Sequence, residues 1–383
     1  MSIAVSRFGD HTPVCSIRAP VCACRTPVQS DKLAGPGGES ACLARRDAMT
    51  VPKRIAVTLP AGPQVEDSIT LVKWAESNGF DDVWFSDAMA PDSLTMVAAV
   101  APHTQRMRVG VAVTPVYTRT PAVFAATANV LAQLLPGRFV LGLGSSSEAI
   151  MERFNGIAME KPLTRVKETA IMVRSMLAGE RSDFDLSTLR SRGYRQEPLP
   201  EPPPIYLAAL RPKMIEMAAE FGDGVVFNLW PQKALPRMLE HVEIGARRAG
   251  KRIEDIEIVN RYLVMVTDDV EEAKARFRTH YTPYYANPVY NSFLKWAGYA
   301  DEAEGILAGW QARDRELSTR SITDEMIDTV CVIGDAERVH RRIREDADAG
   351  IDTTIVSPIG PMPLEEAMPT FEAFTADRFG FEL

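Results

Sequence analysis

Small and polar residues follow several apolar runs of the chain, at the points where buried strands would end. Asp87 follows "DDVWFS" (81–86), Ser145–Ser147 follow "RFVLGLG" (138–144), and Ala208 and Ala209 lie in "PPIYLAAL" (203–210). A carboxylate in this position can bind a ligand or move a proton, although Asp87 could instead cap the helix that follows it. Small residues let backbone N–H groups approach a bound molecule. Tight strand–helix packing is the alternative for the two alanines.

The stretch "RFVLGLGSSSEAI" (138–150) resembles a dinucleotide-binding turn. Gly142 and Gly144 follow an apolar run as in G-x-G-x-x-G, but the third small residue is Ser147. That fingerprint normally opens the first strand–helix unit of its domain, with an acidic residue about 20 positions later. Neither condition is met, so we expect a ligand-binding loop of another architecture.

Motifs for several other chemistries are missing. The five histidines show no metal-ligand spacing, and Cys22-Ala23-Cys24 has no partner ligands at a recognisable distance, so we predict no metal site. There is also no G-x-S-x-G elbow and no phosphate-binding P-loop. Loops that offer backbone donors and few strong acids or bases suit a bound cofactor that carries the reaction.

The elements that must position these loops alternate regularly between strand and helix. From residue 53 onward about eight buried strands are each followed by a helix, and the last unit includes a strand over 328–334. Repeated units of this kind form a parallel sheet covered on both faces, and eight of them favour a closed barrel. The sequence therefore predicts an α/β fold, a (β/α)8 TIM barrel with insertions, whose active face collects the loops after the strands.

We divide the chain into a leader and one barrel domain. Residues 1–50 are rich in Pro, Gly, Ser and Arg and predict a disordered or non-native N-terminal extension. Residues 51–383 form the barrel domain, with an irregular helical insertion over about 270–322. Within it, the aromatic run 280–299 predicts either a lid over an apolar substrate or an insertion packed on the barrel or at a dimer interface.

Composition narrows the classes of partner. The 383 residues are 46% hydrophobic and carry a formal net charge of −8, which argues against binding to nucleic acid or to an anionic membrane surface. No apolar run approaches the ~18–20 residues of a membrane-spanning helix. The first residues contain no continuous apolar stretch of a secretory signal. We expect a cytoplasmic protein.

These strand ends resemble the bacterial luciferase-like superfamily, and in particular its branch that uses the deazaflavin coenzyme F420, such as the methylenetetrahydromethanopterin reductases. The resemblance runs from about Arg54 to Met362. It is carried by "VWFSD" (83–87), "VAVTPVYTRTPAVFAA" (111–126), "LPGRFVLGLGSSS" (135–147) and "PPIYLAALRPKMIEMAAEFGDGVVFN" (203–228). It implies a luciferase-like TIM barrel that binds flavin or deazaflavin at the carboxyl-terminal mouth, with an insertion covering the active face.

The resemblance also implies roles for individual residues. Asp87 would hydrogen-bond the ring system or ribityl chain, and the loop of Gly144, Ser145, Ser146 and Ser147 would lie beside that chain. The backbone of Ala208, Ala209 and Leu210 would receive the coenzyme phosphate, and Arg211 would either pair with it or remain solvated. A bulge of Val111, Ala112 and Val113 would press on the deazaflavin through a non-prolyl cis peptide bond, at either of its two peptide bonds.

Two departures from the family pattern concern the reaction. Many F420-binding members have Asp-His after the second strand, whereas this chain has Asp87-Ala88. The sugar-phosphate dehydrogenases have a glutamate where an ungapped match places Ser147, and Glu148 is adjacent. Asp87 and Glu148 are therefore the candidate catalytic groups, and a sugar-phosphate substrate is in doubt.

The resulting prediction is an F420-dependent oxidoreductase that moves a hydride between the deazaflavin and an organic small molecule. An FMN-dependent monooxygenase, supplied with reduced flavin by a partner reductase, is the alternative, and a barrel that binds flavin without turnover is a third. All-trans peptide bonds over Val111–Val113 would favour FMN. The resemblance also implies a homodimer.

Overall fold

The computed structural model describes residues 51–87 and 90–381, which belong to one compact unit, Thr50–Leu383. The predicted N-terminal extension (1–50) lies outside the described residues, and so does Ala88. Among the helices that are described, none combines the length and the apolarity needed to span a membrane.

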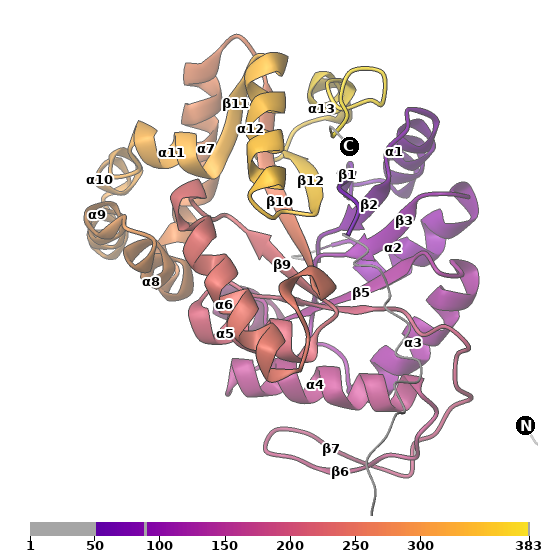
Figure 1. The fold of residues 1–383 in the computed structure, drawn as a ribbon. Coiled ribbons are helices and arrows are strands. Elements are labelled where there is room, and N and C mark those ends of the chain that lie inside the picture. The colour runs from indigo at the N-terminus through magenta and orange to yellow at the C-terminus, as the bar shows by residue number, and fades with distance from the viewer. Residues whose placement is uncertain (1–50, 88–89, 382–383) are drawn as a thin grey trace, which may run out of the picture. The chain divides into compact units, whose positions relative to one another are not determined.

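The described strands close into a parallel barrel of eight (Figure 1). Each of them pairs with its neighbour in chain order, and the last strand, β12, pairs with β1 to complete the ring. This arrangement confirms the predicted TIM barrel. The strands are β1 (Arg54–Leu59), β2 (Asp82–Phe85), β3 (Arg108–Val111), β5 (Phe139–Gly144), β8 (Ile205–Ala208), β9 (Gly224–Asn228), β10 (Glu257–Val266) and β12 (Thr353–Pro358).

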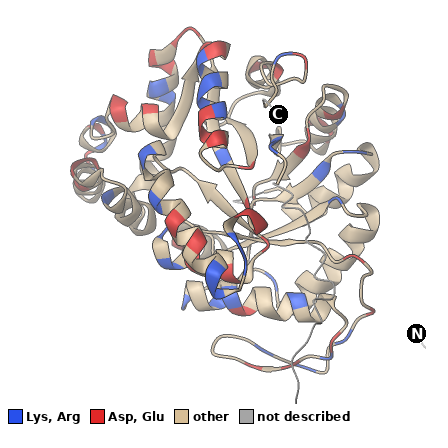
Figure 2. Ribbon diagram, viewed as in Figure 1, with Lys and Arg blue, Asp and Glu red and all other residues tan. Residues whose placement is uncertain are grey.

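Helices cover the outside of the barrel, and their first residues explain where they begin. Pro121, Pro162 and Pro212 each occupy the first turn of a helix, where a missing N–H costs no hydrogen bond. Figure 2 places most Lys, Arg, Asp and Glu on the helices, α12 being a clear example, whereas the strands are mostly uncharged. The covering helices are α1 (Val65–Ser77), α2 (Ser93–Val100), α3 (Pro121–Leu134), α4 (Pro162–Leu177), α5 (Pro212–Phe221), α6 (Leu235–Arg248), α12 (Ala336–Asp348) and α13 (Leu364–Glu372).

The insertion between β10 and β12 is helical, as expected, but it is longer than predicted. It contains α7 (Val270–Ala286), α8 (Pro288–Trp296), α9 (Ala300–Ala312), α10 (Arg315–Arg320) and α11 (Asp324–Val330). The prediction of a strand over 328–334 is wrong for its first three residues. Thr323 caps α11 by accepting a hydrogen bond from the Met326 amide, so the strand β11 starts at Cys331. β11 (Cys331–Gly334) pairs with the end of β10 and is not one of the eight barrel strands.

The barrel interior is layered along the strand direction. A central layer consists of apolar side chains from seven strands: Ala56, Trp84, Val140, Tyr206, Val226, Val259 and Ile355. The layer at the amino ends is charged, with Asp82 between Arg54 and Arg108. The opposite end, where the loops after the strands converge, is the face that the sequence predicts to be functional.

Gly142 is required by the close approach of β3 to β5. A Cβ at this position would overlap the backbone carbonyl oxygen of Val111, which cannot move aside like a flexible side chain. Gly142→Ala is therefore expected to lower the free energy of unfolding by ~3 kcal/mol, the upper end of the cost of overpacking a core, because the obstructing atom belongs to the backbone. Urea titration checks this, with Gly380→Ala as the control because a Cβ at Gly380 would meet nothing within 4 Å. Equal loss in the two variants would contradict the steric explanation.

Candidate functional site

Asp87 lies in the connection after β2, at the carboxyl end of the barrel. Its Oδ2 accepts a hydrogen bond from the Ser93 hydroxyl at 2.7 Å, and Arg119 lies 3.9 Å from the same carboxylate. The N-cap of α2 is Asp92, whose side chain accepts from the Thr95 amide. Asp92 therefore occupies the N-cap position of α2, and Asp87 contacts the first residue of that helix, Ser93, through both its hydroxyl and its backbone.

The environment of Asp87 favours its neutral form. Burial raises the pKa of its carboxyl above the ordinary value, although the hydrogen bond from Ser93 and the charge of Arg119 oppose this. The side chain is 13% exposed, so a ligand at the mouth can still reach it. Asp87 can thus accept a hydrogen bond from a ligand when ionised and donate one when protonated.

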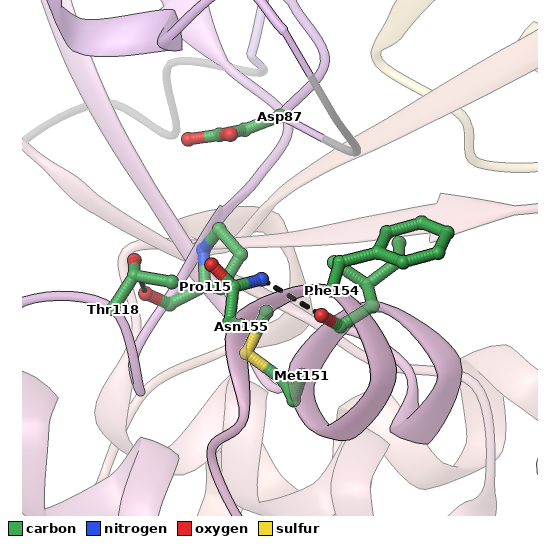
Figure 3. A pocket seen from close by; sticks show the side chains of 7 residues that line it. Asp87, Pro115, Thr118, Met151, Phe154 and Asn155 are labelled. Atoms are coloured by element: carbon green, nitrogen blue, oxygen red, sulfur yellow. Dashed lines mark hydrogen bonds between the residues drawn. The ribbon is translucent and has the colours of Figure 1, made fainter.

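A pocket of about 440 Å³ opens beside Asp87. Figure 3 shows the carboxylate across the pocket from Pro115, Met151 and Asn155. The pocket joins the loop after β2, the short strand β4 (Thr114–Pro115) and the π-helix η2 (Ala149–Phe154). Its lining consists of Asp87, Pro115, Thr118, Ile150, Met151, Phe154 and Asn155.

Most of this lining was not predicted as a site. Pro115 and Thr118 belong to the stretch 111–126, which carries the family resemblance but predicts no role for these two residues. The residues of η2 were missed because a π-helix has no clear periodic signal. Phe154 follows two charged residues, Glu152 and Arg153, and the structure leaves its side chain 63% exposed beside the pocket.

The predicted bulge after β3 is present and packs against β5. The peptide bond Ala112–Val113 is cis, the second of the two bonds at which the resemblance implied one. The bulge brings the Val113 side chain close to Gly144, where an added Cβ would lie 2.5 Å from it. Ala112 and Val113 pack on the apolar layer of the barrel interior, next to Ala208.

The loop after β5 turns sharply into η2. Ser146 has a φ of 62°, and the carbonyl of Ser147 accepts the Met151 amide at 2.9 Å. Ser145 and Ser147 are partly exposed, so their hydroxyls are accessible to a ligand. Glu148 is the N-cap residue before η2 and is exposed, and it is not part of the pocket lining beside Asp87.

The end of β8 leads into the start of α5. Ala208 ends the strand, and Ala209 donates its amide to the Val226 carbonyl at 3.1 Å. Arg211 is at the N-cap of α5 but its side chain makes no capping hydrogen bond. The Arg211 side chain is exposed, and Leu210 packs on the main core. An uncapped helix start with a neighbouring arginine provides the charge and the donors that bind an anionic group.

Together these features suit an organic ligand with an anionic tail. The part of the chain that the structure describes holds no cluster of three or more His, Cys, Asp or Glu side chains that could bind a metal. It does hold a half-buried carboxylate beside a pocket, small residues at two strand ends and an uncapped helix start. A pocket of this volume can enclose a ring system, because small-molecule sites occupy roughly 300–1,000 Å³.

Comparison with known proteins identifies relatives of the same architecture. The sequence profile of the luciferase-like monooxygenase family matches residues 42–353. The 5,10-methylenetetrahydromethanopterin reductase of Archaeoglobus fulgidus is 31% identical over 299 residues, which covers 76% of this chain and 89% of that protein.

Solved structures share the fold at lower identity. The coenzyme F420-dependent tetrahydromethanopterin reductase from Methanopyrus kandleri superimposes with a TM-score of 0.70 at 21% identity, covering 82% of this chain and 96% of that one. The oxygenating constituent of 3,6-diketocamphane monooxygenase from Pseudomonas putida, in complex with FMN, has a TM-score of 0.61 at 18% identity. That superposition covers 86% of this chain and 99% of the monooxygenase chain.

Proposed function

The chain belongs to the luciferase-like monooxygenase family, and from this membership we propose that it is an F420-dependent oxidoreductase acting on an organic small molecule. The observation that carries the proposal is the 31% identity to a methylenetetrahydromethanopterin reductase. The matched region covers 89% of that reductase. Fold likeness alone would not separate F420 from FMN, because solved neighbours bind either coenzyme.

The residues at the mouth fit this coenzyme. When bound, F420 supplies a carbon that accepts or donates a hydride. Asp87 would hydrogen-bond the ring system, and Ser145–Ser147 would lie along the ribityl chain. The uncapped start of α5, with Arg211 beside it, would take the phosphate.

Asp87 is also the group best placed to hold or release a proton. Its pKa is raised by burial, and a carboxyl with a raised pKa works as an acid or base nearer to neutral pH. Glu148 is exposed and outside the pocket lining, so it takes this role only if the loop after β5 moves. We therefore propose Asp87 as the acid–base group.

Dependence on oxygen tests this function against the FMN alternative. Reduced F420 mixed with the protein and a panel of ketones, enones and imines is expected to be oxidised at the same rate with and without oxygen, followed by the absorbance of the oxidised coenzyme. Hydride transfer consumes no oxygen, so an undiminished rate of coenzyme oxidation without oxygen distinguishes it from a monooxygenase reaction. Turnover only with reduced FMN, oxygen and an added flavin reductase would contradict the proposal. The homodimer and the cytoplasmic location stay predictions.

A further inference from the structure

Arg261 of β10 lies inside the barrel near the functional end. It pairs in register with Asn228 of β9 and with Ile355 of β12. Ile355 and Val259 belong to the apolar layer of the barrel interior. Because side chains alternate along a strand, Arg261, two residues after Val259, points into the same interior, one layer closer to the mouth.

The guanidinium of Arg261 has few partners. Its Nε lies 3.5 Å from the Thr58 hydroxyl, and no carboxylate oxygen lies within 4 Å of it among residues 51–87 and 90–381. A guanidinium carries five N–H donors, so most of them are available to a ligand. At the opposite end of the barrel the arginines have an acidic partner, because Arg54 and Arg108 both form ion pairs with Asp82.

One oxygen atom on the neighbouring strand also lacks a hydrogen-bond partner within the described part of the chain. The Asn228 Oδ1 is buried and accepts no hydrogen bond from any described residue. A buried acceptor without a donor costs free energy, which a ligand with a hydroxyl or N–H group would recover. Arg261 and Asn228 are register partners on adjacent strands, so their side chains lie next to each other in the barrel interior.

Two tyrosines of the helical insertion lie close to Arg261. Tyr281 of α7 is buried, and Tyr290 of α8 lies near both Arg261 and Asn228. Burial raises the pKa of Tyr290 to about 12, opposed by a hydrogen bond from the side-chain N–H of Asn228 and by the charge of Arg261, so the hydroxyl stays neutral. Both tyrosines are neutral, so they do not compete with a bound anion for the guanidinium of Arg261.

We propose that Arg261 and Asn228 form a substrate subsite that binds an organic acid, its carboxylate on the guanidinium and an adjacent hydroxyl or N–H on the Asn228 Oδ1. Arginine suits this role because its planar donors match the two oxygens of a carboxylate. The assignment of the bound acid as the substrate rests on the proposed function. The binding itself does not.

Calorimetric titration of the coenzyme-free protein with three small probes tests the subsite. Glycolate carries a carboxylate and a hydroxyl, acetate carries only the carboxylate, and ethylene glycol has no charge. We expect glycolate to bind more tightly than acetate and ethylene glycol not to bind. Arg261→Gln should lower the affinity for glycolate at least tenfold, and Arg261→Lys should lower it less. Asn228→Ala should lower the affinity for glycolate to that of wild type for acetate.

The controls separate this proposal from the coenzyme assignment. Arg315→Gln removes the same charge from an exposed position of α10 and should leave glycolate binding unchanged. Equal glycolate affinity in wild type and Arg261→Gln would overturn the subsite. A second pair of results would also overturn the subsite: no glycolate binding by wild type, together with a loss of F420 affinity in Arg261→Gln. Arg261 would then hold the coenzyme. Arg261-dependent glycolate binding in a protein that binds no F420 would support the subsite and refute the proposed function.

Discussion

Arg108→Met is expected to lower the free energy of unfolding by ~3–5 kcal/mol, the cost of removing one partner of a buried ion pair. Arg108 lies inside the amino end of the barrel, with Asp82 at 2.7 Å and Glu257 at 2.6 Å. Without the guanidinium, two buried carboxylates remain next to each other with fewer donors. Urea unfolding measures the loss, and Arg315→Met, at an exposed position, should change stability by no more than ~0.5 kcal/mol.

The same cluster predicts how stability depends on pH. Burial alone would raise the pKa of Asp82 and of Glu257, but the charge and hydrogen bonds of Arg108, joined at Asp82 by those of Arg54, outweigh burial and lower both values. Carboxyls with lowered pKa in the folded state stabilise it above their unfolded pKa of ~4, and this contribution is lost as the pH falls through the folded values. Arg108→Met should flatten that acid limb. An unchanged acid limb and a loss below ~1 kcal/mol would contradict the role given to Arg108.

Replacing Asp87 is expected to weaken F420 binding without unfolding the protein. Asp87→Asn keeps the shape of the side chain and removes its charge, so a charge-assisted hydrogen bond to the coenzyme would be lost. Such bonds contribute ~1.5–3 kcal/mol, which corresponds to a loss of affinity of about tenfold to a hundredfold. Quenching of coenzyme fluorescence during titration gives the affinity.

The pH dependence distinguishes a direct contact from a structural role of Asp87. Wild-type affinity should fall as the pH drops through the raised pKa of Asp87, whereas the affinity of Asp87→Asn should not follow that titration. Asp348→Asn, an exposed position of α12, is the matched control and should bind like wild type. If Asp87→Asn also binds like wild type, Asp87 serves only to order the connection through Ser93.

The barrel could be predicted because its signals are repeated and local. Buried β-branched runs such as "RIAVTL" (54–59) alternate with amphipathic helices, and prolines such as Pro121 and Pro212 mark helix starts. The strand over 328–334 was placed too early because an apolar run outweighed a capping signal. Thr323 followed by Asp324 and Glu325 is a helix start, and α11 begins there.

The site could be predicted only in part. Asp87 could be predicted because it follows a buried strand. The η2 residues that line its pocket could not, because they are placed by a π-helix, which has no clear period in the sequence. Arg261 was missed because the run "IEIVNRYLVMVT" (256–267) predicts only a strand. Its importance appears when the register shows that it faces the interior and that no described acid pairs with it.

The central claim is that this chain binds F420 for hydride transfer, and paired titrations with F420 and FMN test it most directly. Fluorescence quenching of each coenzyme by the purified full-length protein gives both affinities under the same conditions. We expect saturable binding of F420 that is at least tenfold tighter than binding of FMN. Tight binding of FMN with no detectable binding of F420 would contradict it and assign the chain to the flavin-dependent monooxygenases.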